Sequence, residues 1–332
     1  MKRLVAGVDI DGIVTSLALV DEFGKIYAKG QFPTTDHKEF KSYVSHIKDE
    51  IVCLSASLDI PHYIAAVGIG APNSNYYTGD IESAANLKWK GKLPLAQQLS
   101  QMFDNKPVVV TNDANAAAIG EMIYGGAKGM KHFAVITLGT GLGSGIVVDG
   151  NVLYGHDGFA GEVGHIIVER RDGRECGCGR KGCLECYASS KGLRETALEL
   201  LKKGNDASRL RDIPEDKLTS RDITAAAKAG DAIAKKAFEI TGDYLGSALA
   251  NLVAVASPEA IFLCGGVANA GELIMTPTKR AMEKNIMPLW KGKVKLTFSS
   301  LDHENAPILG AAALAVKEIA KKDTIIARRK IF

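Results

Sequence analysis

Residues 132–155 read HFAVITLGTGLGSGIVVDGNVLYG, and this stretch decides the fold because its pattern also occurs at the start of the chain. The apolar segments HFAVITL, SGIVV and VLYG are separated by GTGLG and DGN, which is typical of three strands joined by tight turns. Residues 4–32 show the same order in LVAGVDI, DG, VTSLALV, DEFG and KIYAKGQF. The repeat predicts two related domains, each presenting a glycine hairpin to a shared cleft, where backbone N–H groups grip phosphates.

Helices alternate with buried strands in the rest of the chain, which predicts an α/β protein. Apolar side chains at helical spacing indicate helices, and short apolar runs bounded by Gly, Pro or Asn indicate buried parallel strands. The expected elements are a helix over 36–57, strands over 63–70 and 107–112, helices over 189–256 around a polar loop at 203–221, a strand over 259–266, and a last Ala-rich helix packed on the N-terminal domain.

Composition and charge exclude several classes of protein. The 332 residues are 46% apolar and carry 41 basic and 38 acidic side chains, a net charge of +3 that leaves no footprint for nucleic acid. No apolar run approaches the ~20 residues of a membrane span, and the apolar run before Asp9 is shorter than we expect of a signal peptide. We therefore expect a cytoplasmic protein without membrane or nucleic-acid partners. Cys53 and Cys264 lie in apolar contexts and are expected to be packed.

The segment GEVGHIIVERRDGRECGCGRKGCLEC, residues 161–186, has a metal-ligand pattern. One imidazole and three sulfurs would fill the tetrahedral shell of zinc, leave no open position for water, and rigidify the loop carrying Glu162 and Glu185. The expected ligands are His165, Cys176, Cys178 and Cys183. The alternatives are ordinary thiols, a disulfide in a secreted chain, or a zinc ribbon that binds nucleic acid; the spacing and the acidic residues disfavour them.

Further polar residues follow predicted strands. Asp9 ends the first strand, and such a carboxylate can hold Mg2+, while the glycines of TLGTGLGSG suit close approach to a ligand. Asn112 and Asp113 end a buried strand and begin a helix, so they are expected to face the ligand cleft of an α/β sheet. Asp113 is also compatible with a plain N-cap role. CGGVA, residues 264–268, repeats the strand, glycine turn and helix arrangement.

These motifs resemble the ROK family of repressors, open reading frames and sugar kinases, within the actin, hexokinase and Hsp70-like (ribonuclease H-like) fold. The motifs that carry the resemblance span nearly the whole chain in the expected order: GVDIDGIVTSLALVD, GIGAPN, ESAANLKW, TNDANAAAIGE, TLGTGLGSGIVVDG, GFAGEVGH, CGCGRKGCLE and LCGGV. The resemblance implies two duplicated α/β domains with a nucleotide and sugar cleft between them. Expected boundaries are 1–120 plus about 306–332 for the first domain and 121–305 for the second.

The resemblance implies specific roles for single residues. Asp113 would be the general base that takes the proton of a sugar hydroxyl, with Asn112 beside it on the sugar. Glu162, His165 and Glu185 would bind further hydroxyls, and His165 would also ligate structural Zn2+. The positions implied for ATP and Mg2+ are Asp9, Gly12, Thr15, Gly139, Thr140, Gly141, Gly143, Gly265 and Gly266.

One departure concerns the first hairpin, where the family pattern is D-x-G-G-T. This chain has Asp11 and Ile13 instead, which adds a carboxylate where phosphate should approach and removes a hydroxyl, so weaker ATP binding is expected. The alternatives are that Asp11 points away or shares Mg2+ with Asp9, and that the second hairpin compensates. Asn73, where relatives have Gly, predicts a different sugar-side loop.

The function expected from the resemblance is transfer of phosphate from ATP to the 6-hydroxyl of a hexose, with glucose as the leading substrate. Kinases for N-acetylmannosamine, fructose or allose share the motifs. A second class is a non-catalytic sugar sensor whose phosphate hairpin has decayed. A homodimer or homotetramer is expected from relatives.

Overall fold

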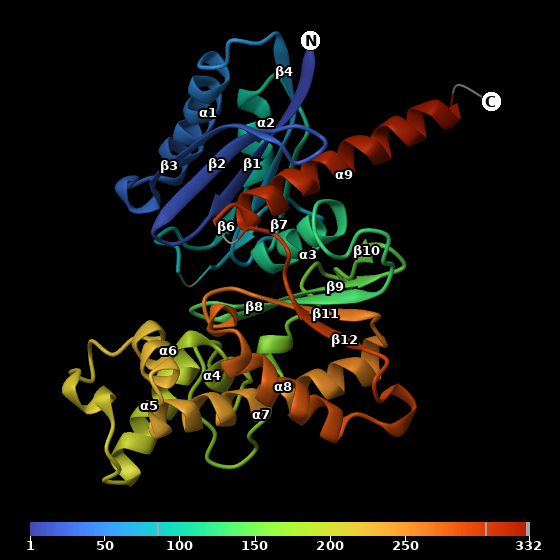
Figure 1. The fold of residues 1–332 in the computed structure, drawn as a ribbon. Helices are drawn as coiled ribbons and strands as arrows, with labels where there is room; N and C mark the ends of the chain where they lie inside the picture. The colour runs from blue at the N-terminus through green and yellow to red at the C-terminus, as the bar shows by residue number, and fades with distance from the viewer. Residues whose placement is uncertain (85, 303, 330–332) are drawn as a thin grey trace. The chain divides into compact units, whose positions relative to one another are not determined.

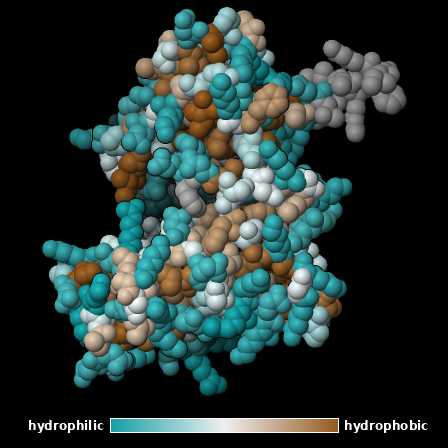
Figure 2. All heavy atoms as spheres, viewed as in Figure 1, coloured by the Kyte–Doolittle hydropathy of each residue, from teal (hydrophilic) through white to brown (hydrophobic). Residues whose placement is uncertain are grey.

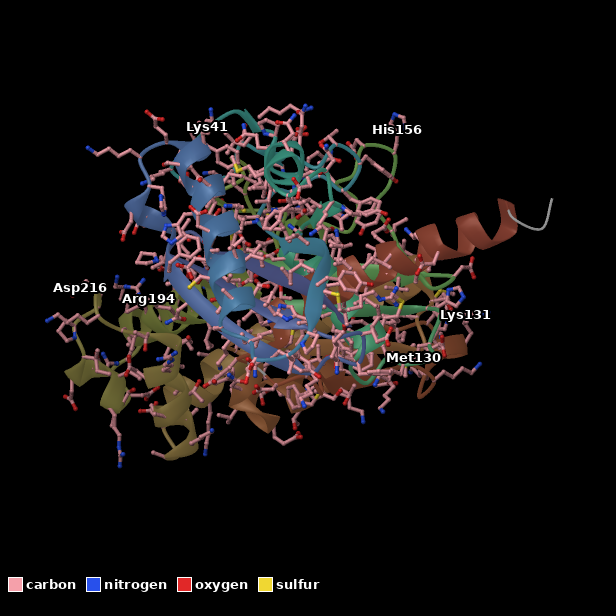
Figure 3. The ribbon with its side chains drawn as sticks, turned by 90° about the horizontal axis from the view of Figure 1, so that it is seen from above. Lys41, Met130, Lys131, His156, Arg194 and Asp216 are labelled. Atoms are coloured by element: carbon pink, nitrogen blue, oxygen red, sulfur yellow. The ribbon has the colours of Figure 1, made fainter. Side chains whose placement is uncertain are left out.

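The computed structural model describes residues 1–84, 86–302 and 304–329, and it forms two compact units (Figure 1). The first unit comprises Met1–Gly129, Val152–Ala160 and the described residues from Ser300 onward. The second comprises Met130–Asn151 and Gly161–Ser299. Met130 and Lys131, labelled in Figure 3, stand where the chain enters the second unit. Each unit is described by itself.

The first unit contains a five-stranded sheet in the order β3-β2-β1-β4-β7. Short turns join β1 (Lys2–Ile10), β2 (Val14–Val20) and β3 (Ile26–Pro33), so these strands are antiparallel. Strands β4 (His62–Gly70) and β7 (Val108–Thr111) follow helical connections and run parallel to β1 and to each other. The predicted strands are therefore confirmed, and three of them end at the same sheet edge.

The helices of the first unit are α1 (Phe40–Ala56), α2 (Leu95–Met102), α3 (Asp113–Ile123) and α9 (Ala306–Arg329). A small ladder, β5 (Ile81–Glu82) with β6 (Lys92–Leu93), and the turn η1 (Thr34–Asp36) complete it. Helix α1 buries one stripe: Tyr43, Val44, Ile47 and Ile51. Cys53 lies off this stripe and is exposed, so the expectation that it is packed is wrong.

The last helix packs directly on the sheet of the first unit, as its alanines predicted. A Cβ atom at Gly68 would lie 2.0 Å from the carbonyl oxygen of Ala311, and one at Gly7 would lie 2.4 Å from that of Ile308. Only glycine in the strands lets the backbone of α9 approach so closely. Residues 330–332 of the expected domain lie outside the described residues.

The second unit repeats the sheet in the order β10-β9-β8-β11-β12. Its strands are β8 (Phe133–Leu138), β9 (Leu142–Val148), β10 (Asn151–Val152), β11 (Ala260–Cys264) and β12 (Lys295–Phe298). Strands β8 and β9 form an antiparallel hairpin, whereas β11 runs parallel to both β8 and β12. The duplicated α/β architecture is thus confirmed.

The helices of the second unit follow the predicted pattern. They are α4 (Glu185–Ala188), α5 (Ser190–Lys203), α6 (Ser220–Lys228), α7 (Ala232–Ala256) and α8 (Glu272–Asn285), with the short turns η2 (Val163–His165), η3 (Arg209–Asp212), η4 (Ala268–Ala270) and η5 (Pro288–Trp290). The polar loop between α5 and α6 is held by Arg194, which Figure 3 labels. Its Nε donates to the Leu218 carbonyl at 2.9 Å. Helices α7 and α8 approach closely at Gly246.

The boundaries of the compact units differ from the expected domain limits. Residues 121–129 stay with the first unit because Tyr124 packs against Gly24 and its hydroxyl donates to the Asp21 carbonyl. Residues 152–160 also belong to the first unit. There Tyr154 stacks on Tyr76, with ring centroids 4.1 Å apart.

The surface is mixed in character. On the face drawn in Figure 2, hydrophilic residues alternate with smaller hydrophobic areas in both units. Within the described part of the chain, no helix combines the length and apolarity needed to cross a membrane.

The close approach of α9 predicts the effect of a single methyl group. Gly68→Ala should lower the free energy of unfolding by about 1–3 kcal/mol, because its Cβ would overlap a backbone carbonyl that has little room to shift. Gly30→Ala in β3 is the control, since its Cβ would meet only ordinary contacts near 3.6 Å. Urea unfolding of both variants measures the difference, and equal stability would contradict the packing described.

Candidate functional site

Carboxylates gather at one edge of the sheet in the first unit. Asp9 lies in β1 opposite Gly70 of β4, which in turn pairs with Thr111 of β7. Asp113 is the first residue of α3, two positions after Thr111. Because parallel strands end at the same edge, the fold places both carboxylates where α/β sheets bind ligands.

Like charges and burial shift the pKa values of this group. Burial, followed by the charges of Asp113 and Asp11, raises the pKa of Asp9 to about 7. Desolvation by the surrounding protein atoms also raises the pKa of Asp113, and the negative charge of Asp11 raises it further. Part of the Asp113 residue nevertheless remains exposed to solvent. The arrangement therefore favours a proton or a cation among these carboxylates.

Asn112, rather than Asp113, holds the N-cap position of α3. The Asn112 side chain accepts a hydrogen bond from the Ala114 N–H at 2.9 Å, and the Asp113 carboxylate accepts from the same N–H at 2.8 Å. The cap role that the sequence left open for Asp113 is thus already filled by its neighbour.

In the first hairpin, Gly12 and Thr15, two residues expected to bind the nucleotide, make packing contacts within the protein. A Cβ at Gly12 would lie 2.5 Å from the carbonyl oxygen of Asn86, so glycine is required there by the protein itself. Thr15 is fully buried, and its hydroxyl is hydrogen-bonded to the hydroxyls of Thr34 and Tyr43. Its position does not support the expected contact between Thr15 and a nucleotide, because alternation along β2 points the side chain into the core.

The second hairpin, residues 139–143, is held by a carboxylate of its own unit. The N–H of Leu142 donates to Oε2 of Glu185 at 2.8 Å, and a Cβ at Gly141 would lie 2.5 Å from the same oxygen. The N–H of Gly139 donates to the Gly141 carbonyl, and that of Gly143 donates to the Thr137 hydroxyl. Thr140 at the tip is exposed. The hairpin therefore has a fixed shape, with Glu185 against its backbone.

Gly265 and Gly266 follow β11 at the same end of the second sheet as this hairpin. Gly265 has φ of +90°, and a Cβ there would lie 2.7 Å from the Leu138 carbonyl. A Cβ at Gly266 would meet nothing within 4 Å. Gly265 is thus required by the fold, whereas Gly266 leaves open space beside the backbone.

The predicted metal ligands converge. The ligand atoms of His165, Cys176, Cys178 and Cys183 all lie within 4.8 Å of one another. Sγ of Cys178 and Sγ of Cys183 are 3.7 Å apart. Two sulfurs bound at about 2.3 Å to a tetrahedral zinc ion would be about 3.8 Å apart, so the ligand set fits zinc.

The pKa values of two of these thiols are shifted in opposite directions. Burial, followed by hydrogen bonds to its neighbouring thiols, raises the pKa of Cys183 to about 12. At Cys178 burial also raises the pKa, but hydrogen bonds from Arg180 and the other thiols outweigh it and lower the pKa to about 6. Three thiolates are therefore not expected together near neutral pH unless a metal ion compensates their charge.

The two ring nitrogens of His165 face different groups. Nδ1 lies 3.7 Å from Sγ of Cys176, whereas Nε2 lies 4.0 Å from Oε2 of Glu162. Oε1 of Glu185 is 3.9 Å from the same sulfur. A metal held through Nδ1 would leave Nε2 free to donate, and the second unit thus brings Glu162, His165 and Glu185 around one ligand cluster.

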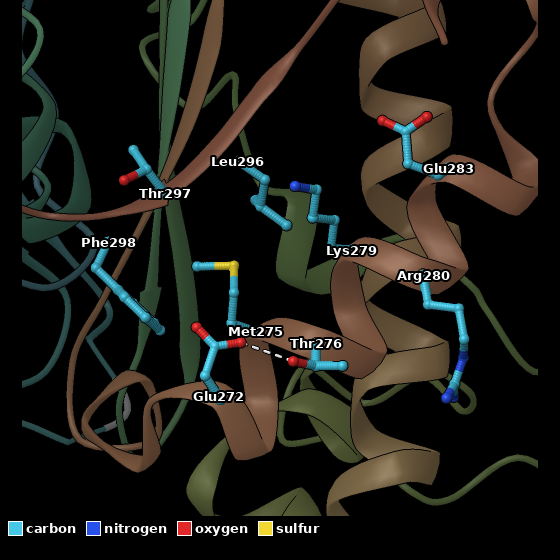
Figure 4. A pocket seen from close by; sticks show the side chains of 9 residues that line it. All are labelled: Glu272, Met275, Thr276, Lys279, Arg280, Glu283, Leu296, Thr297 and Phe298. Atoms are coloured by element: carbon cyan, nitrogen blue, oxygen red, sulfur yellow. Dashed lines mark hydrogen bonds between the residues drawn. The ribbon is translucent and has the colours of Figure 1, made fainter. Parts of the chain in front are cut away.

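Concave regions in the described part of the chain include one in each unit. A pocket of about 370 Å³ beside the first hairpin is lined by Gly12, Thr34, Thr35, Asn86, Leu87, Lys88 and Lys90. A pocket of about 530 Å³ lies between α8 and β12 (Figure 4), and its lining includes Met275, Lys279 and Phe298. The larger pocket contains none of the predicted site residues, so size alone does not identify the site.

A family model and relatives of known name match most of the length of this chain. A family model described as "ROK family" matches residues 5–318. The chain is 35% identical to a glucokinase of Halalkalibacterium halodurans over 95% of this chain and 96% of that protein. It is 32% identical to a xylose repressor of Caldicellulosiruptor bescii, over 78% of this chain and 64% of the repressor.

Solved structures show the same fold. The crystal structure of a ROK family glucokinase from Streptomyces griseus, in complex with glucose and AMPPNP, aligns with a TM-score of 0.79 and 34% identity, covering 95% of this chain and 99% of that one. A ROK family transcriptional regulator, a homolog of the E. coli MLC protein, aligns with a TM-score of 0.84 and 27% identity, covering 96% and 78%.

The raised pKa of Asp9 predicts a dependence of stability on pH. Because its pKa of about 7 lies above its ordinary 3.8, the folded state holds the proton more tightly, and this contribution to stability is lost as pH rises through the interval. Asp9→Asn should therefore gain stability relative to the unaltered protein as pH rises, by on the order of 1–2 kcal/mol after allowance for solvent screening.

Thermal unfolding without divalent cations, at several pH values across that interval, measures this difference. Asp104→Asn is the control, since Asp104 has φ of +51°, a conformation that asparagine tolerates equally well. A difference that stays constant with pH would contradict the shifted carboxyl.

Proposed function

Because the chain belongs to the ROK family, we propose that it is an ATP-dependent hexose kinase that transfers phosphate to the 6-hydroxyl of glucose. The observation that carries the proposal is Asp113, a carboxylate of raised pKa at the ligand-binding edge of the first sheet. The full-length similarity to glucokinases and the glucose complex of a relative support the choice of substrate.

Asp113 is the proposed general base. A base works best when its pKa lies close to the working pH, and crowding together with Asp11 moves the Asp113 carboxyl in that direction. Asp113 would accept the proton of the attacking hydroxyl while Asn112 hydrogen-bonds the sugar. Since phosphoryl transfer depends mainly on positioning and charge stabilisation, proton removal by a fixed carboxylate is the main chemistry that the side chains supply.

Glu162, His165 and Glu185 are the proposed ligands of the other sugar hydroxyls. Their distances to one metal-ligand cluster support this, because zinc bound by the three cysteines and His165 would hold the loop rigid. Zinc would be structural, since four protein ligands leave no position for substrate. Glu185 would use Oε1 for the sugar, because Oε2 already accepts from Leu142.

ATP is the proposed phosphoryl donor. Asp9 and Asp11 are the residues that would hold Mg2+, which supplies positive charge against the phosphates, and the contribution of the Asp11 charge to the raised pKa of Asp9 supports a shared cation. The backbone at Gly139, Thr140, Gly141, Gly143 and Gly266 would face the nucleotide. Gly12 and Gly265 would act through the shape of their loops. Assembly into a homodimer or homotetramer is proposed from the family resemblance.

A regulatory protein is the second candidate, and the similarity to xylose repressors favours it. Such a protein would bind sugar without turning it over, and Asp11 and Ile13 in the first hairpin would then mark a lost phosphate site. Kinases for N-acetylmannosamine, fructose or allose remain alternatives within the enzyme class.

The general-base role predicts the outcome of one conservative change. Asp113→Asn should reduce kcat by about 10²–10⁴-fold, because the amide cannot accept the hydroxyl proton, while sugar binding persists. ADP release with MgATP is measured on glucose, mannose, fructose, allose, N-acetylglucosamine and N-acetylmannosamine, with Asp104→Asn as control. Glucose binding without turnover of any sugar by the unaltered protein would select the regulatory candidate instead.

The zinc proposal predicts that Cys176 and Cys186, which lie in the same segment, differ in their effect on the metal content of the protein. Cys176→Ser should lose bound zinc and lower the thermal midpoint, because one of four ligands is removed. Cys186→Ser is the matched control: its thiol lies outside the ligand set and donates to the Glu175 carbonyl. Mass spectrometry of the purified variants decides, and zinc retained by both or lost by both would reject the assignment.

A further inference from the structure

Glu162 occupies the centre of a three-residue turn. Its φ of −75° and ψ of 59° are those of an inverse γ-turn, and the N–H of Val163 donates to the carbonyl of Gly161 at 2.8 Å. Gly161 enters the turn with φ of +93°, a conformation that favours glycine. The direction of the Glu162 side chain is therefore set by the two peptide groups on either side of it.

One hydroxyl contacts both of these peptide groups. Ser144 in β9 is only 6% exposed; its Oγ donates to the Gly161 carbonyl and accepts from the Val163 N–H at 3.1 Å. The hydroxyl thus uses its single proton and one lone pair on the two ends of the same turn. A buried serine satisfied in this way clamps the turn from the side of the sheet.

The clamp is anchored in rigid structure. Ser144 pairs with Ile136 in the β8–β9 ladder, and it lies two residues after Leu142, whose N–H is bonded to Glu185. Gly164 packs so closely on the Leu142 carbonyl that a Cβ would lie 2.2 Å away. The segment around Glu162 and the second hairpin therefore share one set of backbone contacts.

We propose that Ser144 is a positioning residue for the sugar site: it clamps the turn at Glu162 and through it the start of η2, where the N–H of His165 donates to the Glu162 carbonyl. The proposal rests on the kinase function proposed above.

Steady-state kinetics of Ser144→Ala test the proposal. The KM for glucose should rise by about tenfold, because misplaced binding groups lose much of their effect, while the KM for MgATP stays unchanged. Hydrogen exchange at the Val163 amide should accelerate, since this amide loses one of its two acceptors. Ser144→Cys, which keeps a weak donor and acceptor, should lie between the two proteins and replaces Ser144→Ala if that variant does not fold.

Ser208→Ala is the matched control in the same unit. The Ser208 hydroxyl also donates and accepts, to the Asp231 carboxylate at 2.8 Å and from the Leu210 N–H at 3.2 Å, but it caps η3. Its loss should leave both KM values and Val163 exchange unchanged. An unchanged glucose KM in Ser144→Ala, or equal effects of the two substitutions, would overturn the proposal.

Failure of the kinase function is recognised separately. If the unaltered protein turns over no hexose, glucose binding by calorimetry replaces KM, and Val163 exchange still tests the clamp. Faster exchange and weaker glucose binding confined to the Ser144 variants would then support the positioning role, whereas their absence would overturn it.

Discussion

Electrostatic repulsion among carboxylates at one sheet edge is the constraint on which the first unit depends. Parallel strands must end at a common edge, so Asp9 of β1 and Asp113 after β7 are brought into mutual influence by topology alone. Asp11, in the turn after β1, adds a third negative charge. Such an arrangement costs folding free energy, and a protein keeps it where a proton or a cation is meant to be held.

In the second unit the main constraint is on two glycine-rich segments, the second hairpin and the cysteine cluster, which must keep a fixed shape. The Glu185 carboxylate lies between the cysteine cluster and the second hairpin, with one oxygen near Cys176 and the other bonded to Leu142. Metal ligands, hydroxyl-binding candidates and the hairpin thereby form one continuous network. A metal ion in this network would stabilise groups that are not its own ligands.

Much of this was predictable, because it depends on local sequence pattern. The repeat at 132–155 indicated the duplicated sheets, and the ligand spacing from His165 to Cys183 indicated the metal cluster. The direction of single side chains was harder to predict. Cys53 lies on the solvent side of α1, so the expectation that it is packed was wrong, and Thr15 is buried. Ser144 carried a weak signal as a serine within a glycine run, but its partners are set by long-range packing.

The docking of α9 has a consequence for the order in which the protein can form during synthesis. Gly7 and Gly68 lack side chains to make room for a helix that is translated after the whole second unit, so the face of the first sheet that α9 covers stays open until α9 has left the ribosome. The second unit is complete by Ser299 and has no such delay. Strands β1 and β4 thus emerge well before the helix that completes their burial.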